Sequence, residues 1–311
     1  MFGALRTYEA IEKQSPKNDN HIIMGPWTHG GWAAGTWNRY GPLDFGQNVN
    51  EYYHQLETRF FNHYLKDSAD PALTEATVFE TGTNQWKHYD TWPPAEAHPL
   101  KFYLRTGKKL STEGKAAPGN AAAGYDEYIS DPAHPVPYIE GIRGGRDNQY
   151  VVADQRFAAQ RPDVLCYQSD PLPRDLTVTG RLKADIFLSS TGTDADLVVK
   201  VIDVLPDGFQ RLVRADVFRC KFRNSFEKPE PLVPGKAAEV AFDMNEIAHT
   251  FEQGHRLMVQ IQSSWFPLVD MNPQTFVNIP TCEASDFKKA VIRIYHDPSH
   301  LSAITLPVLG Y

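Results

Sequence analysis

Cysteine is scarce in this chain of 311 residues, since only Cys166, Cys220 and Cys282 occur and they lie far apart. Three separated cysteines form no zinc-site spacing and no disulfide scaffold, so they leave the cellular compartment open. An excess of basic residues is also missing, because the net charge is −7. Proteins that bind nucleic-acid backbones normally carry such an excess. We therefore expect no nucleic-acid partner.

Long apolar segments are absent as well. No run approaches the 18 or so apolar residues of a membrane-spanning helix. The first residues, MFGALRTYEAIEKQ, contain early charges and no long apolar core, which is unlike a signal peptide. The chain also lacks a P-loop and a dinucleotide-binding fingerprint. We therefore expect no membrane association, no cofactor and no metal ion.

The first 70 residues have the pattern of an α/β protein. Ala4, Tyr8 and Ile11 recur at helical spacing. The segment 21–24 is short, apolar and bounded by turn residues, which predicts a buried strand. After a loop rich in glycine and tryptophan, the apolar residues of 51–65 share one helical face, with Asn50 as the expected cap. Helix, strand, loop and helix indicate an α/β layer, although one strand cannot form a sheet by itself.

From about residue 76 onward, apolar residues alternate with polar ones. This alternation predicts half-buried strands that include residues 184–188, 218–223, 240–244, 257–262 and 291–296. The segment 107–145 is rich in glycine, alanine and proline, which favours long loops or an insertion. Many short strands with few helical patterns indicate a β-sandwich, most simply a jelly roll. The chain is therefore expected to be mainly β.

His29 is the first candidate for chemistry. It lies just past the carboxyl end of the predicted strand 21–24, where open α/β sheets place catalytic groups. A histidine there suits a general base, because its ordinary pKa is near neutrality. A loop histidine that hydrogen-bonds to backbone is the simpler alternative. A catalytic histidine needs a nucleophile and an acid, yet the sequence has no G-x-S-x-G elbow. Asp19 precedes the strand, at the wrong end for a partner.

Other polar clusters have structural explanations. Asp194, Asp196 and Asp203 would suit calcium, but charged residues on the solvent face of a sandwich are the simpler interpretation. His296 and His300 flank a proline, which excludes the helix that a metal-binding pair at this spacing needs, so we expect a turn.

Two further features stay open. His249 and His255 flank a turn and have no cysteine or acidic ligand pattern around them. The tryptophans could form a carbohydrate-binding platform or pack at a domain junction. They are Trp27, Trp32, Trp37, Trp86, Trp92 and Trp265.

Taken in order, several segments resemble one protein family. HIIMGPWTHG at 21–30 resembles the catalytic-histidine segment of the cocaine esterase / X-Pro dipeptidyl-peptidase family of serine hydrolases. Within that family the likeness is greatest to α-amino-acid ester hydrolases and glutaryl-cephalosporin acylases. It continues through RFFNHYLK at 59–66, FETGTNQW at 79–86 and FEQGHRLMV at 251–259, and it covers essentially the whole chain.

The resemblance implies both an architecture and a catalytic role. Members of this family join an α/β-hydrolase domain and a helical cap to a C-terminal jelly roll of the galactose-binding-like kind. The resemblance therefore implies a remnant of the hydrolase domain at 1–95 and a jelly roll at 96–311. It also implies that His29 is the one catalytic residue in this chain, whereas the family's serine, oxyanion tyrosine and aspartate precede it. The substrates it implies are small acyl esters, amides or peptides.

Three interpretations remain open at this point. The chain could be the C-terminal part of a longer hydrolase, a separate jelly-roll module with a binding or structural role, or a subunit that completes a catalytic triad with another chain. In each case we expect negligible hydrolase activity from this chain alone. Apolar surface near Ile22, Ile23 and the Tyr53–Tyr64 helical face is expected to be exposed, which favours a homo-oligomer or folding back on the sandwich. A periplasmic or secreted location stays open, because relatives include exported enzymes.

Overall fold

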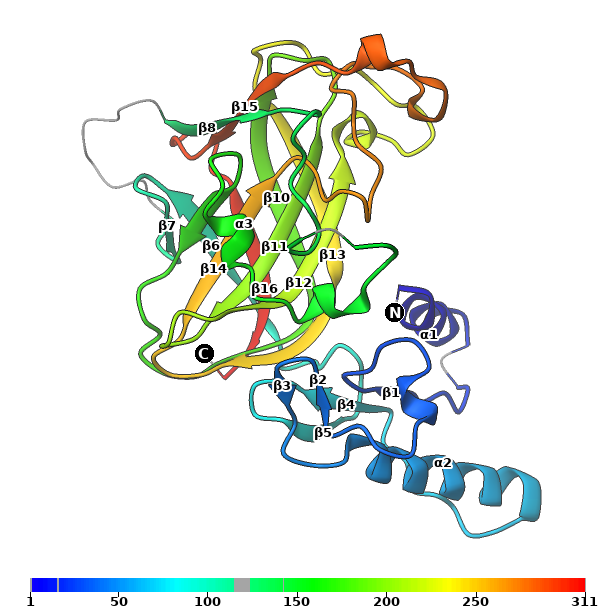
Figure 1. Cartoon of the computed structure of the whole chain (residues 1–311). Helices are drawn as coiled ribbons and strands as arrows, with labels where there is room; N and C mark the ends of the chain where they lie inside the picture. The colour runs from blue at the N-terminus through cyan, green and yellow to red at the C-terminus, as the bar shows by residue number, and fades with distance from the viewer. Residues whose placement is uncertain (1, 16, 115–123, 142, 311) are drawn as a thin grey trace.

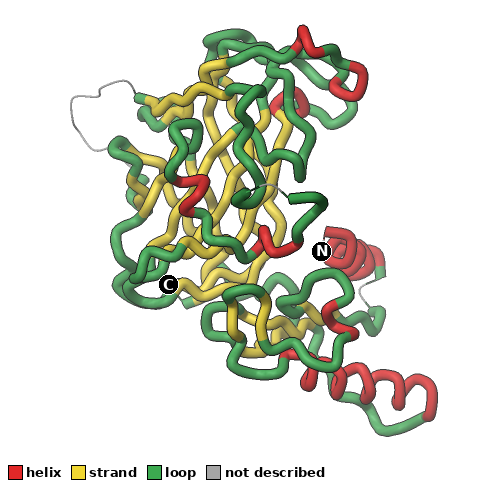
Figure 2. Tube along the Cα trace, viewed as in Figure 1, coloured by secondary structure: helices red, strands yellow, loops and turns green. Residues whose placement is uncertain are grey.

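A small N-terminal α/β layer packs below a large β-sandwich in this computed structural model (Figure 1). The structure describes residues 2–15, 17–114, 124–141 and 143–310. Strands dominate the sandwich, whereas the two long helices belong to the N-terminal layer (Figure 2). The expected fold class, a mainly β chain with a C-terminal sandwich, is therefore confirmed. Among the described helices, none is long and apolar enough to cross a membrane.

Helices α1 and α2 flank the N-terminal layer. Helix α1 (Phe2–Gln14) buries Leu5 and Tyr8 against Ile22. The expectation that Ile22 is exposed was wrong, because this helix covers it and leaves it 5% exposed. Helix α2 (Val49–Lys66) is capped by the Asn48 side chain. The expected cap, Asn50, lies instead inside the first helical turn.

Three strands form the small sheet of this layer, in the order β1 (Ile22–Met24), β4 (Ala76–Glu80) and β5 (Gln85–Tyr89). Strand β1 pairs with β4 in parallel, with Ile22 opposite Ala76. The predicted strand at 21–24 is thus confirmed, and its partners come from beyond residue 70. A short hairpin of β2 (Arg39–Tyr40) and β3 (Leu43–Asp44) lies between β1 and α2 in the chain.

The strands of the sandwich form one 11-stranded sheet that folds over on itself. Strand β10 links its two halves, since it pairs with β13 along its length and with β16 and β15 on its other side. The strands are β6 (His98–Arg105), β7 (Lys109–Ser111), β8 (Tyr125–Ser130), β9 (Leu165–Gln168), β10 (Leu176–Ser190), β11 (Asp196–Val204), β12 (Gln210–Arg219), β13 (Ala238–Phe251), β14 (Arg256–Gln262), β15 (Ala290–Tyr295) and β16 (Ala303–Leu309).

Short helical turns interrupt the connections of the chain. They are η1 (Gly31–Ala33), η2 (Asn148–Val151), α3 (Arg156–Ala159), η3 (Cys220–Phe222), η4 (Ile279–Thr281) and η5 (Ala284–Asp286). The strand expected at 218–223 therefore ends early, because β12 stops at Arg219 and η3 follows. The segment 107–145 contains β7 and β8 as well as loops. Residues 115–123 and 142 of this segment lie outside the described residues.

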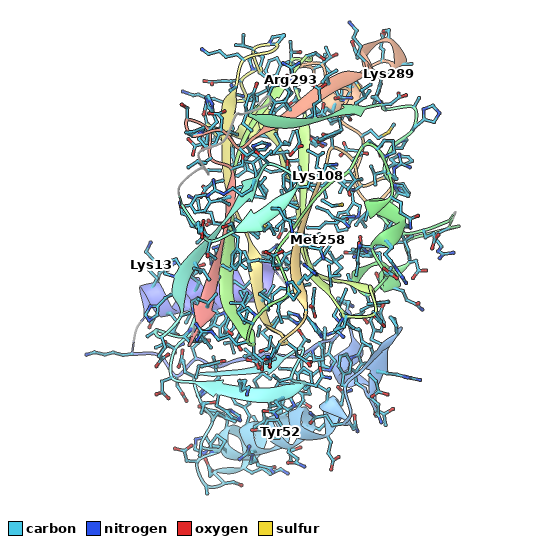
Figure 3. The ribbon with its side chains drawn as sticks, turned by 90° about the vertical axis from the view of Figure 1, so that its left-hand side faces the viewer. Lys13, Tyr52, Lys108, Met258, Lys289 and Arg293 are labelled. Atoms are coloured by element: carbon cyan, nitrogen blue, oxygen red, sulfur yellow. The ribbon has the colours of Figure 1, made fainter. Side chains whose placement is uncertain are left out.

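The alternation of apolar residues correctly identified the core face of the strands. Ile186, Val240 and Ile292 are fully buried in one large cluster. Strand β14 differs from the expectation, because Gln260 and Gln262 on its other face are also fully buried. A second apolar cluster, which includes Tyr138, Met258 and Trp265, covers that face. In Figure 3, the labelled Met258 lies in the sandwich, well above Tyr52 in the N-terminal layer.

Backbone hydrogen bonds join the layer to the sandwich just after β4. Thr81 N donates to Ala248 O at 3.1 Å, and Thr250 N donates to Thr81 O at 2.9 Å. Gly82 follows with φ +92°, and a Cβ at this position would lie 2.1 Å from Thr250 O. Only glycine fits such a close approach in this conformation. The bridge fixes the carboxyl end of β4, and with it the edge of the sheet that carries His29.

Candidate functional site

His29 lies in the loop that leaves the carboxyl end of β1, as expected from its position after the strand. Its side chain is exposed, and its imidazole forms no hydrogen bond with any residue in the described part of the chain. The ring meets Trp32 edge to face, with 5.7 Å between the ring centroids. The alternative of a loop histidine bonded to backbone is therefore wrong, since both ring nitrogens are available to other groups.

A cavity of about 810 Å³ adjoins this loop and lies between the two layers. The N-terminal layer contributes the loop from Met24 to His29, the β2–β3 hairpin and the residues after β4. The sandwich contributes the opposite wall from η2, β12 and the end of β13. Binding cavities for small molecules are commonly 300–1,000 Å³ and commonly lie between domains. This volume could therefore hold a small ligand beside His29.

Charged side chains line the sandwich wall of the cavity. Arg214 Nε pairs with Asp216 Oδ2 at 3.1 Å. Glu246 pairs with Arg181 at 2.9 Å, and it also accepts a hydrogen bond from Trp92 Nε1. Sequence reasoning missed this wall, because nothing in the local pattern of β12 indicates that its outer side chains meet a loop from the start of the chain.

Asp19 lies at the opposite end of β1 from His29, as expected. Its carboxylate contacts His21 Nε2 at 2.9 Å and accepts a hydrogen bond from the Tyr64 hydroxyl. The hydrogen bond from Tyr64, with the neighbouring His21, keeps the pKa of Asp19 below its ordinary value. Asp19 therefore ties α2 to the chain before β1, and it cannot orient His29.

A buried polar cluster occupies the junction behind the cavity. Asp203 is fully buried, and its two carboxylate oxygens lie 2.8 Å from His255 Nδ1 and 3.4 Å from His249 Nε2. Thr81 Oγ1 lies 2.8 Å from His249 Nδ1, so the cluster reaches the N-terminal layer. Burial lowers the pKa of His249, although the Asp203 carboxylate opposes that effect. Local spacing did not reveal an acidic partner for these histidines, because Asp203 comes from a strand that is distant in the sequence.

The other aspartates expected on the solvent face are buried instead. Asp194 is 0% exposed and Asp196 is 3% exposed. Arg219 Nε pairs with Asp196 at 3.0 Å, and Asn272 Nδ2 donates to the same carboxylate at 2.8 Å. Burial raises the pKa of Asp196, although Arg219 acts against it. The expectation of a solvated surface was wrong, since the long connection after β14 covers these side chains.

The remaining candidates have structural roles. His296 Nε2 lies 3.3 Å from Asp126, and His300 lies in the turn expected after it. Most of the tryptophans are packed: Trp27, Trp37 and Trp86 belong to one apolar cluster in the N-terminal layer. Within the described residues, no group of three or more histidine, cysteine or acidic side chains is arranged to hold a metal ion.

Comparison with known proteins agrees with this architecture. Residues 72–305 match the family described as the X-Pro dipeptidyl-peptidase C-terminal non-catalytic domain. Cocaine esterase from Rhodococcus sp. (strain MB1 Bresler) is 30% identical over 312 residues, which cover 98% of this chain and 54% of that protein. The chain thus spans about half the length of the curated relatives it matches.

Two solved structures superpose closely on the chain. An aminopeptidase from a marine sediment archaeon, Thaumarchaeota archaeon, is 37% identical, with a TM-score of 0.92 over 99% of this chain and 52% of that one. An α-amino acid ester hydrolase is 35% identical, with a TM-score of 0.92 over 98% of this chain and 53% of that one. The architecture is thus that of hydrolases in which a β-sandwich adjoins an α/β layer. The chain belongs to the cocaine esterase / X-Pro dipeptidyl-peptidase family of hydrolases, within the half that carries the C-terminal non-catalytic domain.

Proposed function

We propose that this chain supplies the catalytic histidine and the β-sandwich of a serine hydrolase that acts on small acyl esters, amides or peptides. The observation that carries the proposal is the position of His29, which follows the parallel strand β1 and lines the cavity between the two layers. The relatives named as a cocaine esterase, an aminopeptidase and an α-amino acid ester hydrolase support this class of reaction.

The proposed mechanism needs a nucleophile from another polypeptide segment. His29 accepts the proton of a serine hydroxyl as that serine attacks the carbonyl carbon of the substrate. The protonated imidazole then donates this proton to the leaving group, and the neutral ring activates water to release the acyl group. An acid that binds the other ring nitrogen would hold the required tautomer. No G-x-S-x-G elbow occurs in this sequence, so the proposal requires a preceding segment or a separate chain to supply the serine, and with it the acid.

The activity of the purified chain tests the first part of this proposal. We expect no turnover of p-nitrophenyl esters or dipeptide p-nitroanilides above the rate of the buffer, because the nucleophile is missing. Clear turnover that His29→Ala abolishes, and that His134→Ala leaves unchanged, would show that the chain contains its own nucleophile and would contradict the proposal. His134 is a suitable control because it is also exposed and does not line the cavity.

The source of the nucleophile needs a second experiment. DNA upstream of the first codon should encode a G-x-S-x-G elbow, either in frame with this chain or in a neighbouring gene. Joined or co-expressed with that segment, the chain should gain activity that His29→Ala lowers by about 10³-fold or more. Activity that survives this change would exclude His29 as the general base.

We also propose that the hydrolase remnant ends near residue 95 and the sandwich begins near 96. The separate sheets support this boundary, since β5 ends at Tyr89 and β6 begins at His98. The family match begins earlier, at residue 72, and so includes β4 and β5. Exposed Phe61, Tyr64 and Leu65 on α2 support association of this layer with another segment or a second copy.

A further inference from the structure

We propose that the cavity beside His29 binds the free carboxylate of a short peptide through Arg146, a residue of the sandwich half of the chain. This inference rests on the proposed function, because it assigns the peptide class to the same cavity. It concerns the leaving-group side of the substrate, next to the bond that is cleaved.

Arg146 differs from the other charged residues of the cavity because it has no ionic partner among the described residues. The structure shows no ion pair between its guanidinium and any described residue, although the side chain lines the cavity. The Tyr150 ring lies beneath it, with 6.0 Å between Arg146 Cζ and the ring centroid. A guanidinium that rests on an aromatic ring keeps its N–H donors free for a bidentate acceptor.

The other charges of the cavity are compensated by neighbours. Asp44 pairs with Arg39 at 3.5 Å, and Glu246 pairs with Arg181. Asp216 and Arg214 pair with each other. Arg211 Nη1 lies 3.7 Å from Asp203, which is buried behind the cavity. His29 is left for catalysis, and Arg146 is therefore the uncompensated cation among the described residues that line the cavity.

This distribution of charge favours one class of substrate. The described acids of the cavity already have partners, so they offer no free carboxylate to a substrate ammonium. A peptide with a free C-terminus carries a carboxylate on its leaving group, whereas a simple ester or a blocked amide does not. His29 and Arg146 both line the cavity, so a short peptide bound along it would have its peptide bond at His29 and its carboxylate at Arg146. A volume of about 810 Å³ accommodates a molecule of that size.

Binding can be measured without activity. Titration calorimetry of the purified chain with alanyl-alanine should show saturable 1:1 binding. Alanyl-alanine amide, which lacks the carboxylate, should bind at least tenfold more weakly. Arg146→Gln should weaken alanyl-alanine binding by tenfold or more, to the level of the amide. Equal affinity for the two peptides, no measurable binding of either, or an Arg146→Gln variant that binds like the parent would overturn the proposal.

A matched control lies in the same loop. Arg143 is also exposed, but its Nε pairs with Asp147 at 3.4 Å and it does not line the cavity. Arg143→Gln should therefore leave binding unchanged, and an equal loss in this variant would contradict the role given to Arg146. Unchanged circular dichroism and thermal midpoints would show that both variants fold.

The variant His29→Ala separates this inference from the proposed function. It should keep the affinity for alanyl-alanine, because the carboxylate meets Arg146 and not the imidazole. If carboxylate binding fails while hydrolysis in the reconstituted enzyme still requires His29, only the present inference is wrong. If carboxylate binding holds while hydrolysis does not require His29, only the proposed function is wrong.

Discussion

The fully buried Lys200 should make the chain more stable at alkaline pH than at neutral pH. Its ammonium donates one hydrogen bond, to Gln155 Oε1 at 3.0 Å, and has no ion pair with any described residue. The rings of Phe157 and Trp265 lie 5.9 and 5.7 Å from Nζ. Burial lowers the pKa of Lys200 from 10.5 to about 7, since the low-polarity surroundings disfavour the charged form.

The sign and size of the effect follow from proton binding. Between pH 7 and pH 10.5 the unfolded chain binds more protons at Lys200 than the folded chain, so the free energy of unfolding rises with pH. A pKa lowered this far corresponds to about 4 kcal/mol between these limits. Lys200→Met removes this destabilisation at neutral pH. It also leaves Gln155 Oε1 without a hydrogen-bond donor, which costs about 1–3 kcal/mol. The variant should therefore be about 1–3 kcal/mol more stable at pH 7 and less stable near pH 10.

Urea unfolding from pH 6.5 to pH 10, followed by tryptophan fluorescence and circular dichroism, measures this difference. The difference in free energy of unfolding between the parent and Lys200→Met should change sign across the range. Lys236→Met is the control, because Lys236 is exposed and its removal should shift the whole profile by about 0.5 kcal/mol or less. Parallel profiles for the parent and Lys200→Met would show that the buried amine does not resist protonation, and would refute the reasoning.

Two further changes test the junction between the layers. Gly82→Ala should destabilise the fold by about 3 kcal/mol or more in urea, because its Cβ would meet Thr250 O at 2.1 Å. Gly208→Ala, also at positive φ but with open space around it, should cost only about 1 kcal/mol, and equal costs would contradict the close approach. Stability should also fall as pH drops below 6.5, the ordinary pKa of histidine, since the folded chain resists protonation of His249. His249→Gln should flatten that loss between pH 7 and pH 5 in urea titrations, and an unchanged slope would exclude His249 as its source.

Local patterns determined more of the fold than of the site. The alternation around Ile186 and Ile292 reports a strand with one face on a core, because successive side chains of a strand point to opposite faces. It does not report whether another segment covers the opposite face. For this reason the pattern did not reveal that the second faces of β11 and β14 are also covered. Asp196 and Gln260 are buried on these faces, although both were expected to face solvent.

The sequence by itself determined the kind of elements, the family and the position of His29 after a short strand, because these depend on residues that are neighbours in the chain. Only the tertiary structure decided which residues share a cavity with that histidine. Arg146 and the β12 side chains reach the cavity through a sandwich whose strands pair across long separations, and no local spacing encodes that approach. The same holds for Asp203, whose histidine partners lie on another strand and in the turn that follows it.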